Sequence, residues 1–100
     1  MQRGEIWAYN PVTTRPQPRL RLVISADALN DASPLLICLQ VVEDEDPQSL
    51  LAPRLGDVGW AVATLIERTL KSRMTEQVGT ATAEDMEQVD IALRAALALD

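Results

Sequence analysis

Two arginines are the residues of this chain best suited to chemistry, and they lie two positions apart in the segment Arg19–Ser25. The alternation predicts a strand whose faces differ, with Leu20, Leu22 and Ile24 on one and Arg19, Arg21 and Val23 on the other. A guanidinium presents a planar array of donors that fits phosphate or carboxylate oxygens. The sequence therefore predicts an anion site near the start of this strand.

The charge distribution limits the possible partners. A net charge of −6 argues against indiscriminate nucleic-acid binding. Residues 1–21 nevertheless carry four arginines and one acid, whereas residues 26–48 carry six acids and no base. A basic edge on an acidic body can still attract a phosphate. The simpler interpretation, arginines that are solvated or paired with the acids, stays open.

Length and composition predict one domain, residues 1–100. The start of the chain shows no apolar signal segment, and no apolar run approaches the roughly 20 residues needed to cross a bilayer. We therefore expect a cytoplasmic protein without membrane contact. The chain has no histidine and one cysteine, Cys38, which is expected to be buried. Neither a metal nor a cofactor is expected.

Short strands dominate the predicted elements. We expect strands at Glu5–Tyr9, 20–25, 35–42, 50–55, 60–70 and 78–81. The segment 50–55 is expected at an edge of the sheet, and for 60–70 a helix is the alternative. A short helical turn is predicted at 25–30, with Ser25 as its N-cap. A C-terminal helix of about 83–98 follows Thr82, which begins a capping-box pattern. This order predicts a mainly β protein, a small antiparallel β-barrel or half-barrel with two helices.

Two further features have competing interpretations. The acids of Glu43–Asp46 are expected to form a solvated loop, with a divalent-metal site as the alternative. Trp7 and Trp60 could stack on bases, but core packing or a dimer interface explains a tryptophan equally well.

The residues resemble the MazF/PemK-like toxins of bacterial type II toxin–antitoxin systems. The resemblance rests on a combination spread over the chain: Arg3–Trp7, Arg19–Ser25, Asn30, Ser33-Pro34, the strand after it, Arg68–Leu70, Met86, Val89-Asp90, Ala92-Leu93 and Leu97–Leu99. It implies an SH3-like barrel of the CcdB type, a homodimer, and metal-independent cleavage of single-stranded RNA. It also implies a cognate antitoxin whose acidic C-terminal segment covers the RNA groove.

The resemblance assigns catalysis to Arg19, which would stabilise the phosphate while a ribose 2′-hydroxyl attacks it. The chain departs from the family pattern at several positions. Leu20 replaces a proline, and Arg21 replaces an aliphatic residue. The loop Arg15–Pro18 lacks the glycines that the family carries there. The catalytic threonine of the family corresponds to Val41 or Val42.

Three functional hypotheses follow. The first is an active endoribonuclease in which Arg19 works with Arg21, Gln40 or Glu43, and with Arg15 as a possible RNA contact. The second is an inactive or repurposed module that binds nucleic acid or an antitoxin. The third is a CcdB-like gyrase inhibitor, which is less favoured because this sequence lacks the C-terminal Trp-Gly-Ile of that group. The further candidates for lining an RNA groove are Trp7, Thr13, Thr14 and Arg68.

Overall fold

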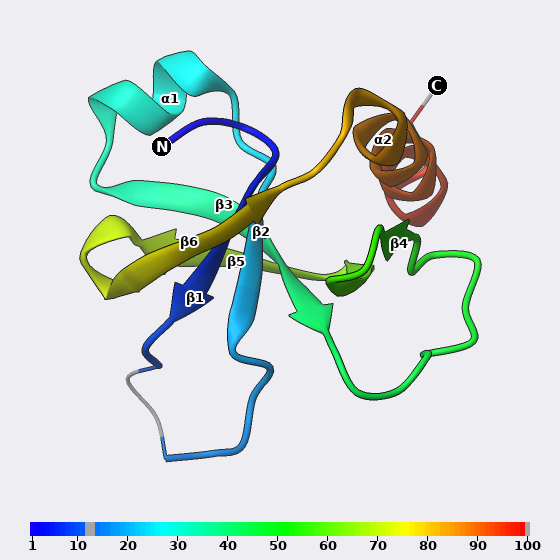
Figure 1. The fold of residues 1–100 in the computed structure, drawn as a ribbon. Coiled ribbons are helices and arrows are strands. Elements are labelled where there is room, and N and C mark those ends of the chain that lie inside the picture. Colours follow the sequence, from blue (N-terminus) through cyan, green and yellow to red (C-terminus); the bar gives the residue numbers. More distant parts are fainter. Residues whose placement is uncertain (12–13, 100) are drawn as a thin grey trace.

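A computed structural model describes residues 1–11 and 14–99 (Figure 1). Its strands are β1 (Glu5–Tyr9), β2 (Leu20–Val23), β3 (Leu35–Val42), β4 (Arg54–Leu55), β5 (Gly59–Leu70) and β6 (Met74–Thr80). Its helices are α1 (Asp27–Ala32), α2 (Ala83–Leu97) and a single 3-10 turn at Lys71–Arg73.

The six strands form one antiparallel sheet in the order β4-β5-β3-β2-β1-β6. The sheet curls into a half-barrel, and in Figure 1 β6 crosses in front of β1 and β2. The short helix α1 connects β2 to β3, and α2 ends the chain beside β5. The prediction of a mainly β antiparallel half-barrel with these two helices is confirmed.

Both faces of the curled sheet are covered, which explains why β3 is apolar on both sides. One cluster joins the sheet to α2 and includes Ile6, Leu20, Leu22, Leu39, Val41, Met86 and Val89. A second cluster lies on the other face and contains Val23, Leu36, Cys38 and Met74, with Trp7 and Tyr9 packed against it. Arg21 shares this second face, because side chains two residues apart on a strand point the same way.

Ser25 is not the N-cap of α1, which corrects the prediction. Its hydroxyl donates to the Asn30 side-chain oxygen, and the Asn30 amide donates back to the Ser25 carbonyl at 2.9 Å. This reciprocal pair, buried at both ends, draws the chain into a turn, so β2 ends at Val23. The helix then begins at Asp27, with Ala26 in the N-cap position and no side-chain cap.

Other element boundaries also differ from the prediction. The edge strand β4 has two residues, because Pro53, just before it, has no N–H to donate to a ladder. The last strand, β6, is longer than predicted and begins at Met74, directly after the 3-10 turn. The long segment 60–70 is a strand, so β3 pairing overrides the helix propensity of its residues.

Helix α2 follows its sequence pattern. The Thr82 hydroxyl accepts a hydrogen bond from the Asp85 N–H at 3.0 Å, which caps the first turn. Met86, Val89 and Ala92 are buried against the sheet. In the described part of the chain, neither helix has the length and apolar character that a bilayer crossing requires.

Candidate functional site

Arg19 lies at the entry to β2, and its side chain faces solvent. The Arg19 carbonyl accepts a hydrogen bond from the Tyr9 N–H at 2.8 Å, which ties this point of the chain to β1. Its side chain is 63% exposed, and Nη2 lies 2.9 Å from Oε2 of Glu43. Glu43 directly follows β3, and the pairing of Leu20 with Val41 brings the two charged residues together.

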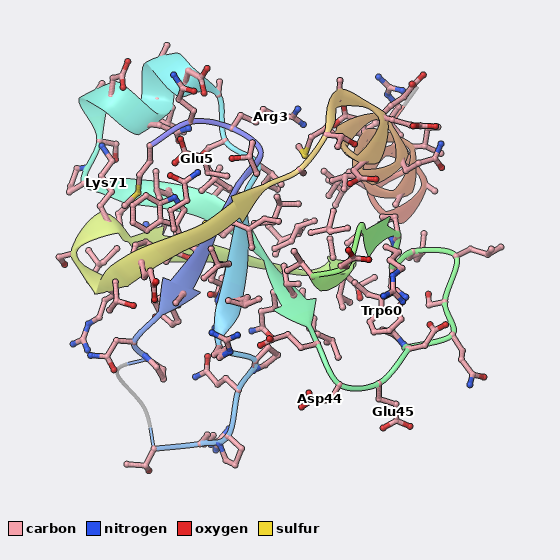
Figure 2. All side chains as sticks on the ribbon, in the orientation of Figure 1. Arg3, Glu5, Asp44, Glu45, Trp60 and Lys71 are labelled. Atoms are coloured by element: carbon pink, nitrogen blue, oxygen red, sulfur yellow. The ribbon has the colours of Figure 1, made fainter. Side chains whose placement is uncertain are left out.

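An open groove of about 590 Å³ surrounds this ion pair, here called the Arg19 groove. Its wall combines the loop before β2 with the loop after β3: Pro16, Gln17, Pro18, Arg19, Val42, Glu43, Asp44 and Glu45. Figure 2 shows Asp44 and Glu45 on the second of these loops. The lining residues therefore include three acids and one arginine, a balance that opposes the approach of a polyanion except beside Arg19.

Neither of the two valines at the expected catalytic position carries a group that moves protons. Val41 is fully buried in the core cluster that joins the sheet to α2. Val42 lines the Arg19 groove and also a neighbouring groove of about 580 Å³. The titratable side chain that contacts Arg19 in this groove is Glu43.

Arg21 is not on the surface beside Arg19, in contrast to the expectation of two exposed guanidinium groups on one face. Its side chain is fully buried and forms an ion pair with Glu67 of β5. Its Nη2 donates to Gln17 Oε1 at 2.8 Å, and Nη1 donates to the Pro18 carbonyl at 2.6 Å. The guanidinium carbon lies 4.4 Å from the centre of the Tyr9 ring.

Gln40 belongs to the same buried cluster and not to the Arg19 groove. Its amide donates to Oε2 of Glu67 at 3.3 Å, and the Thr69 hydroxyl donates to Oε1 at 3.4 Å. Glu67 was not singled out in the sequence. The only signal was an acid inside a long apolar strand, and its pairing with Arg21 required the three-dimensional arrangement of β2, β3 and β5.

Cys38 is buried on the same face, as predicted. Burial raises the pKa of its thiol to about 11, and a hydrogen bond with Thr69 opposes this effect. The thiol is therefore neutral at physiological pH and is no candidate nucleophile.

The remaining candidates lie at different places. Thr14 and Arg15 are exposed on the loop before β2 but do not line the Arg19 groove. Trp7 is half-buried against the second core, and its Nε1 donates to Glu5 at 2.8 Å. Arg68 is opposite Ile37, five positions along β3 from Val42, about 17 Å at the usual strand rise. Thr13 lies outside the described residues.

Among the residues that the structure describes, no group of three or more His, Cys, Asp or Glu side chains is arranged to hold a metal ion.

Comparison with known sequences identifies a family. The sequence profile described as "PemK-like, MazF-like toxin of type II toxin-antitoxin system" matches residues 2–97. Curated protein sequences show no significant match to the chain.

Several solved structures share the fold. An endoribonuclease from a mycobacterial species, solved in complex with its cognate antitoxin, has a TM-score of 0.87 at 19% identity and covers 100% of this chain and 97% of its own. A MazE–MazF complex (Form-II) from Deinococcus radiodurans has a TM-score of 0.79 at 23% identity and covers 100% and 97%. The Mycobacterium tuberculosis toxin MazF-mt6 has a TM-score of 0.77 at 11% identity and covers 96% and 98%. At these identities the likeness is one of fold.

Proposed function

This chain belongs to the PemK-like, MazF-like toxin family of type II toxin–antitoxin systems, and from that premise we propose that it is a toxin that cleaves single-stranded RNA in the Arg19 groove. The observation that carries the proposal is the pair formed by Arg19 and Glu43. A solvent-accessible guanidinium and a carboxylate lie 2.9 Å apart in one groove. The first can hold a phosphate, and the second can accept a proton.

In the proposed reaction, the ribose 2′-hydroxyl attacks the adjacent phosphorus and passes its proton to the Glu43 carboxylate. The bond between the 2′-oxygen and phosphorus forms as the bond to the 5′-oxygen breaks. The departing 5′-oxygen takes a proton from water, so the products end in a 2′,3′-cyclic phosphate and a 5′-hydroxyl. Arg19 donates hydrogen bonds to the phosphate oxygens on which negative charge grows.

Glu43 is assigned the role of base because the other candidates are unsuitable. Arg21 is buried and donates all its hydrogen bonds inside the protein. The Gln40 amide is bonded to Glu67, and an amide is a poor proton acceptor at neutral pH. Glu43 keeps 26% of its side chain exposed, so RNA in the groove can reach it.

The test is cleavage of a single-stranded RNA by the purified protein. Arg19→Ala is expected to lower kcat about 10² to 10³-fold, and Glu43→Gln at least about 10²-fold. A 2′-deoxy analogue of the substrate is expected to resist cleavage, because it lacks the nucleophile. Arg73→Ala and Glu87→Gln, outside the groove, serve as matched controls and are expected to cleave normally. An Arg19→Ala variant as active as the original protein would contradict the assignment.

A second candidate function is a module that keeps the fold and binds a partner without cleaving RNA. The three carboxylates of the Arg19 groove favour it, because they oppose the approach of a polyanion. Absence of cleavage by a protein with an intact circular-dichroism spectrum, together with binding of its antitoxin, would support this function over the first.

Assembly and location complete the proposal. We expect a cognate antitoxin, since the mycobacterial endoribonuclease with this fold was solved with its own, and the family resemblance adds the expectation of an acidic C-terminal segment on it. We expect a homodimer, since exposed Ile37, Ile66 and Leu97 line an apolar groove of about 510 Å³ between the sheet and the end of α2. Cleavage of cellular RNA would place the protein in the cytoplasm.

A further inference from the structure

The buried Arg21 is bonded to the loop that precedes Arg19. Its three nitrogen atoms donate four hydrogen bonds, to Glu67, Gln17 and the carbonyls of Pro18 and Leu20. Two of these acceptors, Gln17 and Pro18, line the Arg19 groove, and Pro18 is bonded covalently to Arg19. The buried Arg21 guanidinium therefore contacts two residues of the groove wall from the interior of the protein.

Gln17 and Pro18 have few other restraints. Pro16 and Pro18 have no N–H, and no backbone–backbone hydrogen bond joins residues 16–18 to another described residue. The first backbone bond of this region is at Arg19, whose carbonyl accepts from Tyr9. Among the described residues, the hydrogen bonds from Arg21 are thus the main restraint on Gln17 and Pro18.

The opposite end of the link is anchored in the sheet. Glu67 of β5 accepts from Arg21, and it also accepts from Gln40 at 3.3 Å and from Thr69 at 3.4 Å. The Tyr9 ring packs 4.4 Å from the guanidinium carbon. Contacts from three strands, β1, β3 and β5, therefore fix the direction of the Arg21 side chain, which projects from β2.

Stability alone does not account for such a cluster. Desolvation of two charges consumes most of their attraction, and apolar replacements of buried ion pairs often leave stability unchanged or raise it. An apolar pair at positions 21 and 67 could not donate hydrogen bonds to the Pro18 carbonyl and the Gln17 side-chain amide, and so could not restrain the loop.

We propose that Arg21, supported by Glu67, is a positioning residue that holds Gln17 and Pro18 and thereby sets the place of the Arg19 guanidinium. In its catalytic part the inference rests on the proposed ribonuclease function. It also makes a claim that is independent of catalysis: without Arg21, the loop before β2 loses its order.

The first measurement needs no activity. The double variant Arg21→Met/Glu67→Gln removes both charges, while the carbonyl oxygen of the new amide can still accept from Gln40 and its NH2 group can donate to the Thr69 hydroxyl oxygen. Backbone NMR order parameters of Gln17 and Arg19 are expected to fall from about 0.85 to below about 0.6 in this variant. Val23→Ala, a core truncation on the same face of β2, is the matched control for lost stability, and its loop is expected to stay ordered.

The second measurement is steady-state cleavage of single-stranded RNA. The double variant is expected to lose about 10² in kcat with KM changed less than threefold, because a misplaced group loses mainly transition-state contacts. The single variant Arg21→Lys keeps the charge but is still expected to have a kcat below that of the original protein, since an ammonium lacks the planar guanidinium that bonds Glu67 and Pro18 together. If the double variant does not fold, Gln17→Ala tests the same link, with an expected three- to tenfold loss of kcat and a lower order parameter at Arg19.

The outcomes separate the two proposals. Unchanged order parameters in a folded variant would overturn the positioning role, whatever the activity. Lower order parameters in a protein that never cleaves RNA would refute the ribonuclease and leave the positioning of the loop standing. Disorder of the loop with unchanged kcat would refute the effect on Arg19.

Discussion

Arg19 and Arg21 have the same side chain and lie two positions apart at the start of β2, yet their environments are opposite. Arg19 is 63% exposed, and its ion pair with Glu43 lines the open Arg19 groove. The Arg21 side chain is fully buried, and each of its three guanidinium nitrogen atoms donates a hydrogen bond. The difference arises because Tyr9, Gln17 and Glu67 close over Arg21, whereas the open groove lies in front of Arg19.

The buried ion pair predicts an asymmetry between its two partners. Loss of one partner of a buried pair costs about 3 to 5 kcal/mol when the other charge stays buried. Glu67→Leu is expected to lie in this range, because Arg21 has no access to water. Arg21→Leu is expected to cost about 2 kcal/mol, because Glu67 is 26% exposed and can be hydrated. Urea unfolding of both variants measures which one loses more free energy of unfolding, and a larger loss for Arg21→Leu would contradict this account.

Cys38 predicts how stability changes in alkaline solution. Its thiol pKa is raised from 9.0 to about 11 in the folded protein, so above pH 9 the unfolded chain releases a proton that the native chain keeps. The free energy of unfolding should therefore fall between pH 9 and 11, by on the order of 2 kcal/mol from this group. Denaturant titrations of the original protein and of Cys38→Ala measure it. The variant is expected to show a smaller decline over this range, and an equal decline would refute the assignment.

At the scale of elements, the site is built from strand ends and loops. β2 and β3 pair so that the residue before one, Arg19, meets the residue after the other, Glu43. β5 contributes Glu67, which pairs with the buried Arg21 of β2. The rigid sheet thus positions two loops that have little regular structure of their own.

Gly59 allows β5 to lie close to the end of β3 beside the site. A Cβ at this position would overlap the Val42 carbonyl oxygen and lie 3.3 Å from the Glu43 Cα. Gly59→Ala is therefore expected to destabilise the fold by about 2 kcal/mol or more and to displace Glu43. Gly79→Ala, whose Cβ would meet atoms only at ordinary contact distances of 3.9 and 4.0 Å, is the matched control. Thermal unfolding of both variants decides, and a Gly59→Ala protein as stable as Gly79→Ala would refute the close approach.

Thr82 caps α2, and its removal has a defined cost. Thr82→Ala leaves the Asp85 N–H without its side-chain acceptor and is expected to cost about 1 kcal/mol. Thr82→Ser keeps the hydroxyl and is expected to stay within about 0.3 kcal/mol of the original protein. Chemical unfolding measures both, and equal losses in the two variants would show that the hydroxyl does not act as a cap.

At the scale of the whole molecule, the apolar surface is unevenly distributed. Ile37, Ile66, Leu97 and Leu99 are each more than a third exposed, and all four line the groove between the sheet and α2. In Figure 1 this helix lies at the upper right and α1 at the upper left. The surface around α2 is therefore the proposed place for a second copy of the chain.

A charge placed in this groove tests the dimer. Ile66→Asp is expected to shift the protein from dimer to monomer in sedimentation velocity, because an uncompensated charge would be buried in the interface. Leu50→Asp is the matched control, since Leu50 is 99% exposed and lies outside the groove. A variant Ile66→Asp that sediments as the original dimer would exclude this face, and a monomeric original protein would exclude the dimer itself.

Local patterns determined most of the elements. Period-two alternation located β1 and the start of β2, and a continuous apolar run located β3. The capping pattern at Thr82 and the apolar stripe after it located α2 to within one residue at its C-terminal end. These signals are local, since they depend on side chains a few positions apart. The end of β2 was misjudged because the Ser25–Asn30 pair competes with strand and cap alike, and its strength depends on burial.

By itself the sequence determined the half-barrel, its helices, the family resemblance and the presence of arginines before β2. Only the tertiary structure decided which arginine faces the groove, that Glu43 is its partner, and that Glu67 neutralises the other. The physical reason is that burial and long-range pairing are properties of the register between strands. Glu67 is 46 positions from Arg21 along the chain, and no local pattern specifies that they meet.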